Sequence, residues 1–108
     1  MIKVTYYIGT NDKDTYKKEL LDIEFHEVFD KLFGDYTLQR AQSVYTMKKT
    51  GTIIKENTFM ITTFIDDYIE ITKPKLKQHI QHNCNILKEK LNQESILVEV
   101  TEPGVIFC

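Results

Sequence analysis

Apolar and polar side chains alternate along the first nine residues of the chain. The apolar positions are Ile2, Val4, Tyr6 and Ile8, and the run ends at Gly9. Because successive side chains of a strand point to opposite faces, this alternation predicts a first strand with one face in the core.

The longest β-like stretch runs from Thr52 to Asp66. It is rich in Ile, Thr and Phe and contains no Gly or Pro, a composition typical of a well-packed strand. From Phe59 onward both of its faces carry apolar side chains. Apolar residues on both faces of a strand indicate that both are covered. We expect helices on one face and a second subunit on the other, and therefore a homodimer through the open face of the sheet.

The remaining segments read as two helices and two strands. The apolar periods predict a helix over about Asp22 to Phe33, a strand over Tyr36 to Met47, a helix from Thr72 to Asn92 and a last strand over Ile96, Val98 and Val100. The alternation of the second strand breaks at Arg40 to Ser43, which predicts a bulge or a polar patch there.

The resulting order is strand, helix, strand, strand, helix, strand. This order predicts an α+β fold of the ferredoxin-like split βαβ kind, with a four-stranded antiparallel sheet and two helices on one face. We expect residues 1–108 to form a single domain of this fold.

Composition narrows the classes of function. The net charge is −2 and the pI is about 5.9, which argues against general nucleic-acid binding. Two cysteines do not make a disulfide framework, and the N-terminus resembles neither a secretion signal nor a membrane span. We therefore expect a cytoplasmic protein with reduced thiols. Plentiful Lys, Ile, Asn and Tyr beside a single Ala suggest an AT-rich genome.

Four short motifs carry a resemblance that covers most of the chain. They are Tyr7-Ile8-Gly9, Tyr36-Thr37-Leu38, Gly51-Thr52-Ile53-Ile54-Lys55-Glu56 and Gln93-Glu94-Ser95-Ile96, followed by an ending at Val105-Ile106-Phe107. With them the chain resembles a family of short bacterial proteins known only as a domain of unknown function. It departs from that family at Arg40, where an acidic residue is usual, and at Ser43, where Gly is usual. The resemblance implies the same fold and implies no activity.

The candidate ligand or partner site centres on Glu56. Arg40, the only arginine of the chain, is expected on the neighbouring strand, where a fork between guanidinium and carboxylate would satisfy both groups. Lys55 is adjacent and points to the opposite face. Tyr7 and Tyr45, near strand ends, could line a pocket or a partner surface. The alternative, which we favour for the charged pair, is a structural ion pair under the dimer, with the tyrosines as core or dimer contacts.

Metal and thiol chemistry receive little support. Residues 11–15 are rich in carboxylates but lack the calcium-loop pattern. His79 and His82 share one side of a helix, and His26 is a distant third candidate, so we favour exposed histidines over a zinc site. Cys84 falls in an apolar stripe and is interpreted as packing. We expect no metal and no cofactor.

These observations favour a non-enzymatic binding protein. In this hypothesis the dimer is a phage or mobile-element accessory that binds a host defence protein or sequesters a small anionic, nucleotide-like ligand. The basis is the absence of a phosphate loop, a nucleophile elbow and paired carboxylates, together with Arg40 near Glu56 and the abundant tyrosine. The alternative is a small dimeric ferredoxin-like enzyme with Glu56, Tyr45 or His26 as acid or base. A purely structural dimer is a third hypothesis.

Overall fold

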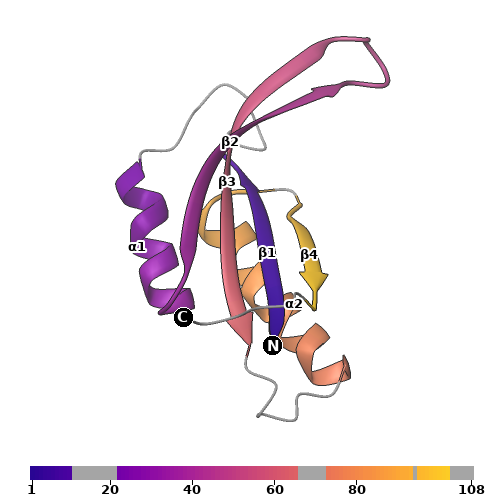
Figure 1. Cartoon of the computed structure of the whole chain (residues 1–108). Coiled ribbons are helices and arrows are strands. Elements are labelled where there is room, and N and C mark those ends of the chain that lie inside the picture. The colour runs from indigo at the N-terminus through magenta and orange to yellow at the C-terminus, as the bar shows by residue number, and fades with distance from the viewer. Residues whose placement is uncertain (11–21, 66–72, 94, 103–108) are drawn as a thin grey trace.

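The computed structural model of the chain describes residues 1–10, 22–65, 73–93 and 95–102. In chain order the elements are β1 (Ile2–Gly9), α1 (Asp22–Phe33), β2 (Thr37–Thr46), β3 (Ile53–Ile65), α2 (Lys73–Lys90) and β4 (Leu97–Thr101). Figure 1 shows both helices on the same side of the sheet. The sequence places these elements within a few residues of their observed bounds, because each is encoded by a local apolar period.

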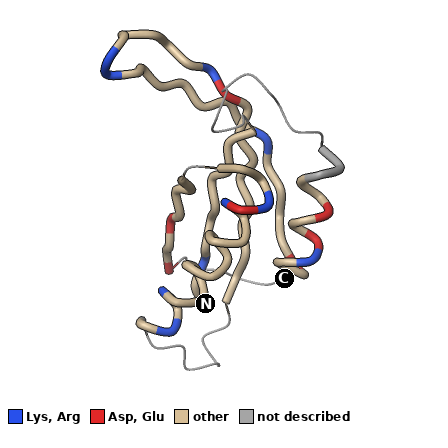
Figure 2. Tube along the Cα trace, turned by 180° about the vertical axis from the view of Figure 1, so that it is seen from behind, with Lys and Arg blue, Asp and Glu red and all other residues tan. Residues whose placement is uncertain are grey.

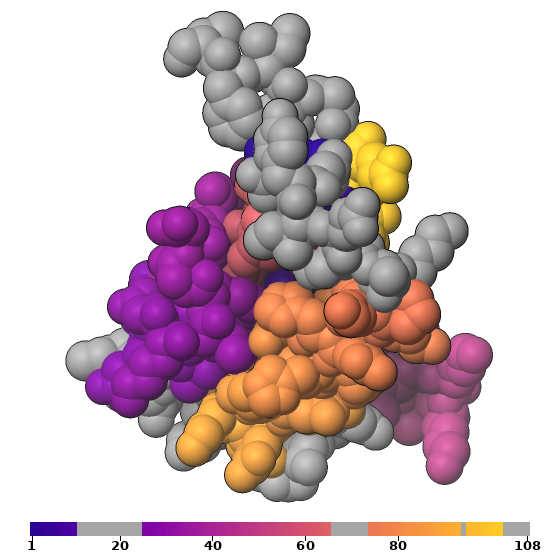
Figure 3. All heavy atoms as spheres, turned by 90° about the horizontal axis from the view of Figure 1, so that it is seen from below, coloured from indigo at the N-terminus to yellow at the C-terminus, as the bar shows by residue number. Residues whose placement is uncertain are grey.

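The four strands form an antiparallel sheet in the order β2-β3-β1-β4. The first and third strands are therefore central, as the ferredoxin-like arrangement requires, and the predicted fold is confirmed. In Figure 3 the two helices lie side by side as one layer.

The core lies between the helices and one face of the sheet. Its fully buried side chains come from α1 (Phe25, Phe29), from α2 and its end (Leu87, Leu91), from β1 (Val4, Tyr6, Ile8) and from β3 (Ile61). Aromatic rings join the layers, since the ring centroid of Phe25 lies 4.7 Å from that of Phe59, and Tyr6 lies 5.1 Å from Phe33. The predicted core face of the first strand is confirmed.

The β2–β3 hairpin extends beyond the sheet as a two-stranded arm (Figure 1). The arm comprises residues 42–57, which lie past the last pair between β1 and β3. The pairing of the hairpin runs without interruption from Thr37 opposite Thr62 to Thr46 opposite Ile53, so the predicted bulge near Arg40 is absent. The alternation breaks for another reason. Most of β2 is exposed on both faces in the described structure, and a strand in water on both faces does not need an apolar side.

Candidate functional site

The carboxylate of Glu56 lies where the hairpin leaves the sheet. In an antiparallel pair, residues directly opposite each other share a face. Ser43 is opposite Glu56, and Gly9 is opposite Thr58. All four positions therefore belong to the open face of the sheet, away from the helices, where Glu56 is half-buried.

The carboxylate packs directly against the backbone of β1. A side chain added at Gly9 would bring its Cβ within 2.1 Å of Oε1 of Glu56 and 2.6 Å of Cδ. Glu56 thus occupies the space that any other residue at position 9 would fill. Just beyond, both the backbone N and Oγ1 of Thr10 donate to the carbonyl oxygen of Asn57, at 3.0 and 2.9 Å, which fastens the end of β1 beside Glu56.

Two pairs of hydroxyl groups lie on the open face, one next to Glu56 in the register and one further along the sheet. Oγ of Ser43 and Oγ1 of Thr58 are 2.7 Å apart, and Oγ1 of Thr5 and Oγ1 of Thr62 are 3.3 Å apart. Thr5 and Thr58 are buried although they face away from the helices. The open face is thus partly polar, with short side chains at these four positions.

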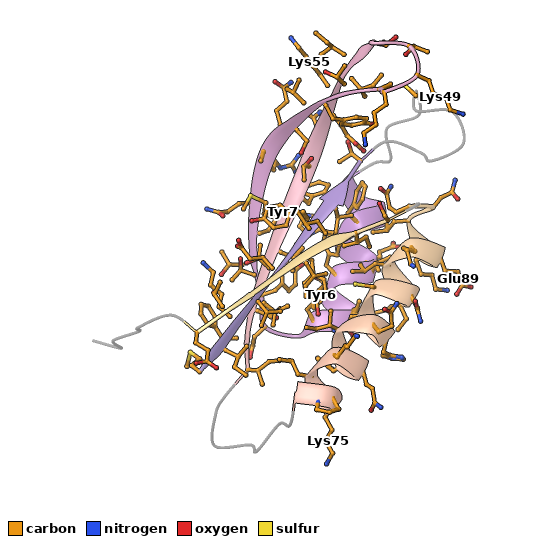
Figure 4. The ribbon with its side chains drawn as sticks, turned by 90° about the vertical axis from the view of Figure 1, so that its right-hand side faces the viewer. Tyr6, Tyr7, Lys49, Lys55, Lys75 and Glu89 are labelled. Atoms are coloured by element: carbon orange, nitrogen blue, oxygen red, sulfur yellow. The ribbon has the colours of Figure 1, made fainter. Side chains whose placement is uncertain are left out.

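Tyr7 lies on the same face, two residues before Gly9. It is opposite Met60 on one side and Leu97 on the other, and its OH donates to Oε1 of Glu99 at 3.4 Å. Burial and the neighbouring carboxylate of Glu99 raise the pKa of Tyr7. The phenol therefore stays protonated at neutral pH and can donate. Figure 4 shows Tyr7 together with Tyr6, which lies between the sheet and the helices.

Arg40 does not share this face. It is opposite Phe59, a core residue, and its guanidinium carbon lies 5.0 Å from the centroid of that ring, a cation–π geometry. Arg40 and Glu56 start on opposite faces of the hairpin. The expected fork between the two side chains therefore stays a prediction, which the register alone does not supply.

The other two predicted residues lie further out on the arm. Tyr45 is opposite Ile54 on the face of Glu56, whereas Lys55 is opposite Val44 on the face of Arg40. Figure 2 shows that basic positions recur along the arm. The structure thus places Glu56, Tyr7 and Tyr45 on one face and Arg40 and Lys55 on the other. Sequence reasoning missed the roles of Gly9, Ser43 and Thr58, although Gly9 closes the Tyr7-Ile8-Gly9 motif.

The other candidate groups stand apart from Glu56. His79 and His82 are exposed on α2, and His26 is half-buried on α1; within the described ranges no three His, Cys, Asp or Glu side chains gather as a metal site. The carboxylates of residues 11–15 lie outside the described residues, as does the apolar ending at residues 105–107. No helix in the described part of the chain is long and apolar enough to cross a membrane.

Cys84 lies in a separate groove. This groove has a volume of about 850 Å³ and lies between α2 and β4, with mainly aliphatic walls that include Ile80, Val98 and Val100. Burial raises the pKa of the Cys84 thiol, although nearby Lys88 lowers it. A thiol that stays protonated is a poor nucleophile, which agrees with a packing role.

No protein-family model matches the sequence, and no curated protein matches it either, in agreement with the resemblance to a family without a known activity. Solved structures do match. Phage SAM lyase in complex with S-methyl-5'-thioadenosine has a TM-score of 0.65 and 23% identity over 96% of this chain and 82% of that chain. Its apo state has a TM-score of 0.66 and 24% identity over 93% and 78%. CutA from Synechococcus elongatus has a TM-score of 0.56 and 13% identity over 94% and 76%. At these identities the likenesses show the fold.

These matches overturn the preference for a non-enzymatic binding protein. The chain shares its fold over nearly its whole length with phage SAM lyase, an enzyme, so the alternative hypothesis of a small ferredoxin-like enzyme around Glu56 is better supported. The preference failed because missing motifs exclude only the mechanisms that those motifs serve. A reaction that needs one placed carboxylate leaves no such motif.

Proposed function

We propose that this chain is an enzyme that cleaves a sulfonium substrate of the S-adenosylmethionine class. The carrying observation is the half-buried carboxylate of Glu56 on the open face, in a fold shared with phage SAM lyase. A negative group held against rigid backbone is what a positively charged substrate requires for binding and orientation.

The chemistry makes modest demands on the protein. When the bond between the sulfonium sulfur and the γ-carbon breaks, the bonding pair stays on sulfur, and S-methyl-5'-thioadenosine leaves as a neutral thioether. No general acid has to protonate this leaving group. In our proposal Glu56 holds the sulfonium cation and acts as a base that takes a proton from the β-carbon of the amino-acid part. The electron pair of that C–H bond forms the double bond between the β- and γ-carbons, so 2-aminobut-3-enoate leaves together with S-methyl-5'-thioadenosine and the proton stays on Glu56.

Other open-face residues are suited to the rest of such a substrate. Tyr7, with Met60 and Leu97 opposite it, offers aromatic and apolar surface for a purine ring. Ser43, whose hydroxyl is bonded to that of the buried Thr58, offers a hydroxyl group for the ribose. Tyr45 would extend this surface along the arm, whereas Arg40 and Lys55 would lie outside it.

The open face also supports assembly. Phe64 and Leu97 on this face are 50% and 68% exposed, and among the described elements both helices lie on the other side (Figure 4). We propose that residues 1–108 act as one domain and form a homodimer through this face, with the second copy enclosing the Glu56 region. The free thiol of Cys84 is consistent with a reducing, cytoplasmic location.

The test is product formation. The purified protein is incubated with S-adenosylmethionine, and S-methyl-5'-thioadenosine is quantified by liquid chromatography and mass spectrometry. We expect wild-type protein to form it and Glu56→Gln to lose at least about 100-fold in kcat/KM, the usual scale for a lost acid–base group. Glu89→Gln removes the same charge from the exposed surface of α2 (Figure 4) and should be fully active.

S-adenosylhomocysteine, a neutral thioether, should not be cleaved. The proposal is wrong if wild-type protein forms no S-methyl-5'-thioadenosine, or if Glu56→Gln and Glu89→Gln are equally active.

A further inference from the structure

Gly9 differs from the other glycines of the described chain. Gly34 and Gly51 have φ angles of +68° and +70°, and open space surrounds the position where a side chain would begin. Those two are needed for their left-handed turns. Gly9 ends strand β1 without a positive φ, so its backbone would accept any residue.

Space explains this glycine instead. A Cβ at position 9 would lie 2.1 Å from Oε1, 2.6 Å from Cδ and 3.0 Å from Oε2 of Glu56. All three atoms of the carboxylate are therefore in contact range of one missing methyl group. Glycine within a strand weakens it, so a strand glycine with ordinary φ needs another reason, and here the reason is the carboxylate.

The surroundings make this contact well defined. Thr10, the next residue, is buried and bonded through its N and Oγ1 to the carbonyl of Asn57. On the other side Ser43 is opposite Glu56 and bonded to Thr58, the partner of Gly9. The backbones on both sides of the carboxylate are thus tied together.

We infer that Gly9 is the positioning residue for Glu56. Because residue 9 has no side chain, the Glu56 carboxylate can pack against its Cα, and this contact fixes the carboxylate on the open face. The catalytic importance of this carboxylate position rests on the proposed function. The contact itself stands on geometry alone.

The inference predicts a variant that moves a catalytic group without removing it. In Gly9→Ala the new methyl group must displace the carboxylate, which is the far end of a flexible side chain, while the backbone stays where it is. We expect kcat with S-adenosylmethionine to fall about 100-fold, the scale of a misplacement of about 1 Å. The thermal midpoint should not fall, because alanine suits a strand better than glycine.

A double-mutant cycle separates positioning from a general effect on the fold. In a Glu56→Ala background no carboxylate remains to be displaced, so Gly9→Ala should cost no further activity. A Gly9→Ala effect of equal size in both backgrounds would overturn the inference. If Gly9→Ala alone does not fold, the double variant, whose space is cleared, should fold; failure of both would also overturn it.

A structural readout keeps this inference distinct from the proposed reaction. In a crystal structure of Gly9→Ala the Glu56 carboxylate should have left its position over residue 9, whether or not the wild-type protein cleaves S-adenosylmethionine. A carboxylate in its original position would disprove the positioning role of Gly9. If the wild-type protein shows no turnover but the carboxylate is displaced in Gly9→Ala, the proposed reaction is wrong and the positioning role of Gly9 is supported.

Discussion

Tyr6 and Asn83 form a polar pair inside the core. Nδ2 of Asn83 donates to the OH of Tyr6 at 3.0 Å, and the two residues are 1% and 4% exposed. Burial raises the pKa of Tyr6, and the hydrogen bond from Asn83 lowers it. A buried hydroxyl is tolerated because it has a partner, so this bond links β1 to α2 at one specific point.

Removing one member of this pair should destabilise the protein. Asn83→Leu leaves the Tyr6 hydroxyl without its donor, and we expect a loss of about 1 to 3 kcal/mol in the free energy of unfolding, measured by urea denaturation. Adding Tyr6→Phe to that variant should restore part of the loss. Asn85→Leu, at an exposed position of the same helix, is the control and should change stability by less than about 0.5 kcal/mol. Equal losses from both asparagine variants would contradict a role for the buried bond.

Residues of the site were predictable to different degrees. Glu56 could be assigned to the face of Met60 and Phe64 from the period of two alone. Its pairing with Arg40 stays a prediction. The register puts Arg40 opposite Phe59, and the offset between two strands is set by the turn that joins them and by packing, which the pattern of either strand does not specify. Ser43 and Thr58 carry no signal of their own until the hairpin pairs them.

At the scale of elements, α1 is tied to β2 by a short connection. The helix ends at Phe33, Gly34 takes a left-handed φ of +68°, as is common after a helix, and the OH of Tyr36 then donates to the Asp30 carboxylate. This hydrogen bond, with smaller contributions from burial and the charge of Asp30, raises the pKa of Tyr36 from 10.0 to about 12.

The hydrogen bond makes stability depend on pH in the alkaline range. Because the folded pKa lies above the unfolded one, the contribution of Tyr36 is complete below about pH 10 and is lost as the pH rises towards about 12. The difference in thermal midpoint between wild type and Tyr36→Phe should therefore shrink across pH 9 to 12. The other tyrosines titrate in both proteins, so their effect on the thermal midpoint cancels in the difference. A difference that stays constant over this range would rule out the contribution.

The arm is the element that the sequence described least well. Its strands were predicted, but its projection from the body was not. The exposure of both faces depends on how far the neighbouring strand and the helices extend, which the pattern of the hairpin does not specify. The polar middle of β2 was accordingly interpreted as a bulge or as a polar patch on one face.

At the scale of the whole molecule, two helices cover one face of a four-stranded sheet and leave the other open. Exposed apolar side chains then fall into two groups. Phe64 lies on the open face, whereas Ile53, also on β3 and 63% exposed, lies on the opposite face of the arm. Because exposed apolar surface can mark an interaction site, Phe64 and Ile53 are suitable positions for testing the two faces separately.

This separation allows a test of the proposed dimer. Light scattering on size-exclusion fractions should give twice the 12.7 kDa chain mass for wild type and Ile53→Lys, and the single mass for Phe64→Lys, because a charge would be buried at the open-face interface. A single mass for wild type would contradict the dimer. Dissociation by Ile53→Lys alone would move the interface to the arm.

The sequence by itself determined the order of the elements, the core face of β1 and the face on which Glu56 lies. Each of these follows from a period of two or 3.6 residues, which is local information. Only the tertiary structure decided that Arg40 packs over Phe59 and that the Glu56 carboxylate rests on Gly9. Those contacts join residues far apart in the chain, and they depend on strand order, register and space, which no local pattern specifies.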